Sequence, residues 1–179
     1  MSHPIKPTGL SEATSDNVSV LRLSVAWEQC EKHLYHLEQS IKALQPNLPI
    51  TEAYISSQTD EQVRVWDQFI LRFTKLQDTL GARFYPALLD YLQEPAATQA
   101  MIDKLQRLEQ LGFLEQASDW GVLRAIRNQF AHDYPFDENL KAAYLHQAIE
   151  SVAILRQAMA LGQAFMAAKG FLQQSSKNS

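Results

Sequence analysis

Apolar residues recur along this chain at alternating steps of three and four, the spacing of one face of an α-helix. The first such stripe starts at Leu23 and stops at Leu44, just before Pro46 and Pro49. Its members are Leu23, Trp27, Cys30, Leu34, Leu37, Ile41 and Leu44. This spacing predicts a long helix with one buried face, ended by the prolines.

A second stripe predicts another long helix. Thr59 is followed three positions later by Gln62, the spacing of a capping box at a helix start. Gly81 and Pro86 interrupt the stripe, and we expect a bend there because proline cannot donate to the carbonyl four residues back. The stripe comprises Trp66, Phe69, Phe73, Leu76, Leu80, Phe84, Leu88 and Tyr91. The stretch 47–57 is interpreted as the connection between the two helices.

Three further helices are predicted in the second half of the chain. The first ends at Gly112, a left-handed terminator, the next follows Ser118 as N-cap, and Asp137 caps the last. Their apolar stripes are Met101, Ile102, Leu105, Leu108 and Leu111, then Leu123, Ile126 and Phe130, and then Leu145, Ile149, Val152, Leu155, Met159, Gly162 and Met166. No stretch alternates with period two for long enough to predict a strand.

Five helices with connections of moderate length predict an all-α fold, an antiparallel four-helix-type bundle with an additional short helix. Residues 18–172 form the predicted domain. Residues 1–17 and 173–179 are polar, and we expect flexible ends there.

Composition narrows the functional classes. The chain has 179 residues, of which 46% are hydrophobic and 20% charged, as in a globular domain. A single cysteine, Cys30, excludes an internal disulfide and a multi-thiolate metal site, and it is expected to be a small buried residue on the first stripe. With no basic leader ahead of an apolar core and no membrane-length apolar run, we expect a cytoplasmic protein with no membrane association.

Candidate chemistry is concentrated between Arg127 and Tyr134, in the run RNQFAHDY. The Arg127 guanidinium is permanently charged, and its N–H groups can donate to two phosphate oxygens at once. His132 can exchange a proton near neutral pH. Asn128 and His132 share a helix face, and Arg124 extends a cationic strip on the side away from the apolar edge. Because the net charge is −4, any contact with RNA must use a local patch of this kind.

Such a group could cleave RNA without a metal ion. His132 would move a proton at the 2′-hydroxyl or the leaving oxygen, while Arg127 would stabilise charge on the phosphorus. One imidazole cannot easily do both proton transfers, so this hypothesis needs a homodimer that supplies a second one. A purely structural role stays open, since an arginine and a histidine also stabilise a helix C-terminus and Tyr-Pro is an ordinary turn pair.

The spacing of Arg127, His132 and Tyr134 resembles the R-x4-H-x-Y signature of the HEPN superfamily. Residues 18–172 resemble in organisation the toxin subunits of prokaryotic HEPN/MNT toxin–antitoxin modules. The resemblance implies a dimeric, metal-independent endoribonuclease toxin with Arg127 and His132 as the catalytic pair and Asn128 and Asp133 as supporting groups.

The resemblance also implies a partner. This would be a nucleotidyltransferase antitoxin of the MNT type, which would transfer AMP from ATP onto Tyr134 and so block the positive strip. Some similar proteins are regarded as substrate-binding subunits of nucleotidyltransferases, so the alternative function, a non-catalytic helical substrate-binding or docking subunit, stays open. RNA would be the substrate, with Arg124 as an RNA-binding residue, and no cofactor is expected.

His33 and His36 are a candidate metal pair, because they stand three apart on the first predicted helix. No HExxH spacing is present, and polar residues beside an apolar stripe usually form a solvated face. We therefore expect no metal.

Overall fold

The structure, a computed structural model, describes residues 9–131 and 137–173, with side chains at 17–131 and 137–172. Its regular elements are all helical, which confirms the predicted fold class within these ranges. The α-helices are α1 (Gly9–Leu44), α2 (Glu52–Ser56), α3 (Asp60–Thr79), α4 (Tyr85–Tyr91), α5 (Met101–Gln110), α6 (Asp119–Ala131) and α7 (Glu138–Ala168). Short elements are η1 (Gln45–Asn47), η2 (Leu80–Phe84), η3 (Pro95–Thr98) and η4 (Phe171–Gln173).

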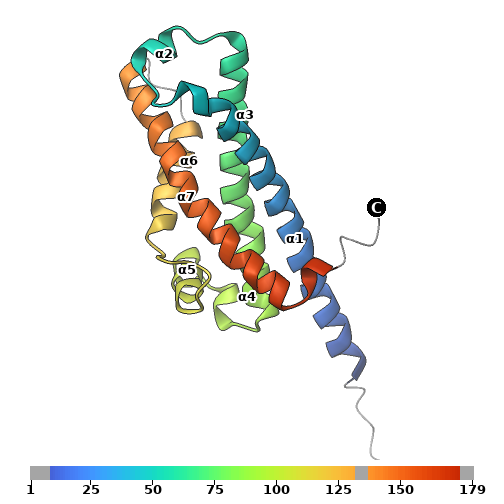
Figure 1. Cartoon of the computed structure of the whole chain (residues 1–179). Helices are drawn as coiled ribbons and strands as arrows, with labels where there is room; N and C mark the ends of the chain where they lie inside the picture. The colour runs from blue at the N-terminus through green and yellow to red at the C-terminus, as the bar shows by residue number, and fades with distance from the viewer. Residues whose placement is uncertain (1–8, 132–136, 174–179) are drawn as a thin grey trace, which may run out of the picture.

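The long helices lie side by side as a bundle (Figure 1). α1 packs along α3, α6 packs on both α3 and α7, and α7 also contacts α1. α2 lies at one end of the bundle, and α4 and α5 lie at the other (Figure 1). The N-terminal part of α1 extends beyond the rest of the bundle.

Contacts between α1 and α7 show that neighbouring helices run antiparallel. Near one end, Trp27 of α1 lies against Gly162 of α7. Further along α1, Glu38 accepts two hydrogen bonds from Arg156 of α7, at 2.6 and 2.8 Å. Residue numbers therefore rise along α1 while they fall along α7, as the predicted bundle requires.

The stripe predicted for the first helix forms part of the core. Leu23, Cys30 and Leu37 are fully buried, and Leu34 packs partly buried against them. Burial raises the pKa of the Cys30 thiol to about 12, with a smaller contribution from Glu31. A thiol this basic stays protonated at neutral pH, so Cys30 is a small core residue, as expected.

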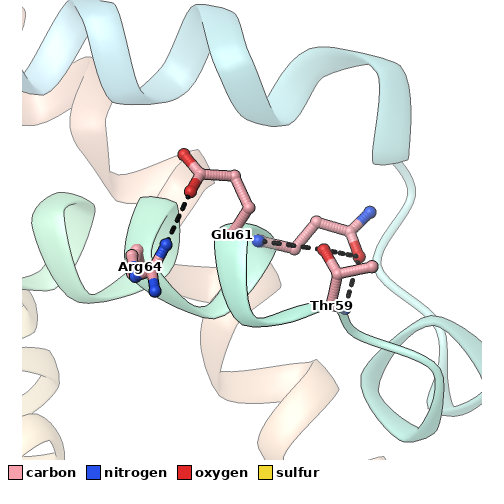
Figure 2. Close-up of polar contacts among 4 residues, drawn as sticks. Thr59, Glu61 and Arg64 are labelled. Carbon is pink, nitrogen blue, oxygen red and sulfur yellow. Dashed lines mark hydrogen bonds and ion pairs between the residues drawn. The ribbon is translucent and has the colours of Figure 1, made fainter.

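The predicted capping box opens α3. The Thr59 side chain accepts from the backbone N–H of Gln62, and the Gln62 amide oxygen accepts from the backbone N–H of Thr59 at 2.9 Å (Figure 2). The reciprocal bonds satisfy two backbone donors that have no partner inside the helix. One turn on, Arg64 pairs with Glu61 at 3.1 Å on the solvent side (Figure 2).

The interruption predicted at Gly81 and Pro86 takes the form of a π-helical turn. The turn is η2, between α3 and α4, and the backbone N–H of Tyr85 donates to the carbonyl of Leu80, five residues back. Pro86 has no N–H with which to continue the α-helical pattern, and the wider turn accommodates it. Gly81 is buried within this turn.

Two features of the first half differ from the sequence prediction. α1 begins at Gly9, nine residues before the predicted domain boundary at residue 18. The stretch interpreted as a connection contains α2, whose N-cap Thr51 accepts from the backbone N–H of Tyr54 at 3.2 Å. Neither feature has an apolar stripe of its own, because α2 is only five residues long and residues 9–17 are mostly polar.

The predicted helix ends in the second half fit the structure. Gly112 has a φ of 80° after α5, and Phe113 N–H donates to the Leu108 carbonyl at 2.8 Å, as in a Schellman motif. The Asp137 carboxylate accepts from the Leu140 N–H at 2.8 Å and caps α7. α6 begins directly after Ser118, as predicted, but the Ser118 hydroxyl donates to the Gln116 side chain and does not cap the helix; the Ser118 backbone carbonyl accepts from Gly121 N–H.

Alanine substitution at Gly162 and at Gly121 should have opposite effects on the free energy of unfolding. A Cβ on Gly162 would lie 2.6 Å from a ring carbon of Trp27 and 3.3 Å from one of Phe84, whereas a Cβ on Gly121 would meet nothing within 4 Å. We expect Gly162→Ala to lower the free energy of unfolding by about 1–3 kcal/mol, because the overpacking outweighs the better helix propensity. Gly121→Ala should raise it by about 0.5–1 kcal/mol. Urea denaturation of both variants checks this, and equal responses would contradict the packing at Gly162.

Candidate functional site

The candidate site lies at the end of α6, where the structure describes part of the motif. Arg127 and Asn128 belong to the last turns of this helix. His132, Asp133 and Tyr134 lie outside the described residues, so the predicted pairing of Arg127 with His132 stays a prediction.

α6 is oriented by its apolar edge, as the sequence predicts. Leu123 and Ile126 are fully buried, and Phe130 packs edge-on against Phe73 of α3 with 5.9 Å between ring centroids. These contacts fix which side of α6 faces the core. Arg124, exposed, and Arg127, half-buried, therefore lie on the outward side.

The Arg127 guanidinium is positioned by two neighbours. One terminal nitrogen lies 3.4 Å from a carboxylate oxygen of Asp78 on α3, and the other donates to the Asn128 amide oxygen at 3.3 Å. Both side chains of the ion pair are 40% exposed, so solvent reaches the charge and the pair adds little to stability. The contacts hold Arg127 near Asn128 without burying it, and the guanidinium keeps donors for a ligand.

A groove of about 460 Å³ runs from Arg127 along the outward side of α6. One wall is α6, a second is the end of α3 with η2, and a third is α5. Residues from these three walls include Arg124 and Trp120, Gln77 and Gly81, and Met101 and Ile102. Arg124 forms no ion pair with any residue of the described ranges, so the groove has a cation free for a ligand next to the paired Arg127.

Sequence reasoning missed the α3 and α5 sides of the groove. Asp78 and Gln77 come from α3. Gln77 is polar and does not belong to the predicted apolar stripe, yet it is only 6% exposed, beside the stripe residue Leu76. A glutamine directly beside a core leucine was the available signal. Asp78 and Arg127 are 49 positions apart in the sequence, and a single apolar stripe does not specify which helices pack together.

The histidines considered for a metal site have other contacts. His33 Nδ1 lies 3.2 Å from a guanidinium nitrogen of Arg72, which can only donate, so Nδ1 acts as an acceptor. Across residues 9–131 and 137–173, no three or more His, Cys, Asp or Glu side chains are grouped so that they could hold a metal ion.

His33 predicts a pH response. Burial lowers its pKa below 6.5, and the positive charges of Arg72, Lys75, His36 and Lys32 lower it further. Below pH 6.5 the unfolded chain therefore binds more protons than the folded chain does. Protonation of His33 then favours unfolding, so the free energy of unfolding decreases as the pH falls below that value. We expect His33→Gln to lose less stability than the parent between pH 7.5 and 5.5 in urea denaturation. An identical loss in both proteins would contradict this assignment.

None of the helices, over the residues that the structure describes, has the length and apolar character needed to cross a membrane.

Comparison of the chain with protein-family models, with curated proteins and with solved structures found no match.

Proposed function

We propose that this chain is a metal-independent endoribonuclease of the HEPN type, the toxin of a HEPN/MNT toxin–antitoxin module. The observation that carries the proposal is the position of Arg127. It lies at one end of a groove that also contains Arg124, and His132 follows it in the sequence by five positions. Two guanidinium groups at a solvent-accessible groove suit a phosphodiester, because each can fork toward phosphate oxygens.

The proposed reaction uses the RNA's own 2′-hydroxyl. His132 accepts the 2′-hydroxyl proton while O2′ forms a bond to phosphorus, and the bond from phosphorus to O5′ breaks. Arg127 stabilises the charge that develops on the non-bridging oxygens. The products are a 2′,3′-cyclic phosphate and a 5′-hydroxyl, so no water and no metal ion enters this step. Asn128 supports Arg127 through the bond described above, and Asp133 is assigned a supporting role by the resemblance alone.

The departing O5′ must receive a proton, and a second imidazole supplies it most simply. We propose that a homodimer brings two copies of the motif together so that each His132 has a counterpart. Pairing two such strips also increases the positive field, which offsets the overall charge of −4.

The proposed regulator is an MNT-type nucleotidyltransferase. Transfer of AMP from ATP to the Tyr134 hydroxyl would release pyrophosphate and place an anionic nucleotide near the two arginines. This would neutralise the positive strip and occupy the path of the RNA phosphate.

The proposal is tested by incubating the purified chain with RNA in EDTA. We expect cleavage by the parent and none by His132→Ala, while His146→Ala, which removes an exposed histidine on α7 outside the groove, should cleave as the parent does. Absence of cleavage by the unmodified parent would contradict the nuclease proposal and favour the alternative, a helical subunit that docks a nucleotidyltransferase.

The regulation is tested separately by co-expression with an MNT-type nucleotidyltransferase. Intact-mass spectrometry should show an increase corresponding to one or more AMP groups, and Tyr134→Phe should not acquire it. Growth rescued by the transferase while the chain stays unmodified would contradict this mode of regulation.

A further inference from the structure

The groove extends from Arg127 toward Trp120 and α5. Along α6, Trp120 stands seven positions before Arg127, which corresponds to about 10 Å at the rise of an α-helix. Both residues line the groove, together with Met101 and Ile102 of α5, which are 36% and 58% exposed. The end near Arg127 is thus cationic and the end near α5 is apolar.

Gln77, a residue that lines this groove, carries an unsatisfied polar atom. Its side chain is 6% exposed, and its amide oxygen is buried without a hydrogen-bond partner among the residues that the structure describes. A buried acceptor without a partner destabilises a fold, because it has lost its bonds to water. Because Gln77 lines the groove, rotation of its side chain on binding would turn this oxygen toward a donor of the ligand.

Gly81 lets Trp120 pack closely against η2. A Cβ at this position would come within 2.7 Å of a ring carbon of Trp120, so the absence of a side chain lets the indole pack against η2. Packed in this way, Trp120 is only 4% exposed, and it lines the groove together with residues of η2 and α5. The volume of about 460 Å³ falls in the range of roughly 300–1,000 Å³ typical of small-molecule sites.

We propose that this groove is a nucleotide-binding subsite, in which a nucleobase lies between η2 and α5 and donates a hydrogen bond to Gln77. The proposal rests on the proposed function, and the base belongs to the RNA nucleotide next to the phosphate at Arg127. Arg124, between Trp120 and Arg127 on α6, binds the same phosphate from the adjacent turn of the helix. Asp78 also lines the groove and repels the phosphate, so it keeps the anion on the Arg124 side.

The binding test uses isothermal titration calorimetry of the full chain with AMP, GMP, CMP and UMP, and with inorganic phosphate for comparison. We expect at least one nucleotide to bind about tenfold more tightly than phosphate, and Gln77→Met to remove that advantage. Gln77→Met should also melt at the same or a higher temperature than the parent, because it removes a buried unpartnered oxygen. A role in folding alone would lower the melting temperature.

The matched control is Gln58→Met, which alters a glutamine whose amide nitrogen is likewise buried and unpartnered within the described ranges but which lies outside the groove. It should retain the nucleotide preference. Equal affinity for nucleotides and phosphate, no binding of either, or an unchanged preference in Gln77→Met would each overturn the subsite.

The subsite and the nuclease proposal can fail independently. If the parent cleaves RNA and Gln77→Met cleaves at the same positions with the same base preference, the subsite is wrong and the nuclease stands. If the parent leaves RNA intact but binds nucleotides through Gln77, the subsite stands and the nuclease is wrong.

Discussion

Replacement of Arg127 by alanine is expected to slow RNA cleavage by about 100- to 1,000-fold, the usual effect of removing one donor that stabilises transition-state charge. Arg127→Lys should recover only part of the rate, because an ammonium group keeps the charge but cannot fork across two phosphate oxygens. Initial rates on a defined RNA in EDTA measure both effects.

The same substitution should leave the fold intact. The ion pair between Arg127 and Asp78 is 40% exposed on each side, and pairs of this kind contribute about 0–1 kcal/mol. The control is Arg64→Ala, which removes an exposed arginine with a single ion pair to Glu61 at the far end of α3 (Figure 2). If Arg64→Ala slows cleavage as much as Arg127→Ala does, the effect reflects total charge, and the assigned role of Arg127 is wrong.

Phe73→Ala should be the most destabilising of the substitutions considered for this chain. Phe73 is fully buried on α3, and its ring contacts Phe69 on the same helix and Phe130 on α6. Removing a buried phenylalanine typically lowers the free energy of unfolding by about 3–5 kcal/mol, through lost burial and the cavity that remains. Urea denaturation monitored by circular dichroism measures the change.

Phe73→Ala should also destabilise the helix end that carries the candidate site. Since Phe130 packs on Phe73 two residues after Asn128, the cavity would loosen the end of α6, and amide exchange there should accelerate more than at α2. Val63→Ala, at an exposed position of α3, should change stability by no more than about 0.5 kcal/mol. A comparable loss in Val63→Ala would show that α3 responds to any truncation.

The long helices could be predicted from the sequence because each buries one continuous stripe. Leu23, Trp27 and Cys30 illustrate this for α1, and Leu145, Val152 and Leu155 for α7. Helix ends could be predicted where a side chain has a defined role, as with the capping box of α3 and the left-handed Gly112 after α5.

What could not be predicted depends on contacts between elements. α2 is a single turn held by the Thr51 cap, which is too short to give a periodic signal. The close packing of Gly81 against Trp120, 39 positions later in the sequence, is likewise a contact between elements. For the same reason the motif indicated Arg127 and Arg124, whereas the opposite walls of the groove, with Gln77 and Ile102, needed the packing of α3 and α5 beside α6.

The proposed reaction proceeds by attack of the RNA's own 2′-hydroxyl, and the ends of the cleavage products test this most directly. A defined oligoribonucleotide is incubated in EDTA, alongside a copy with one 2′-deoxynucleotide on the 5′ side of the cleaved bond, and the products are identified by mass spectrometry. We predict 2′,3′-cyclic phosphate and 5′-hydroxyl ends from the first and no cleavage at that bond in the second. Cleavage of the deoxy-substituted bond, or products with 5′-phosphate ends, would contradict the account.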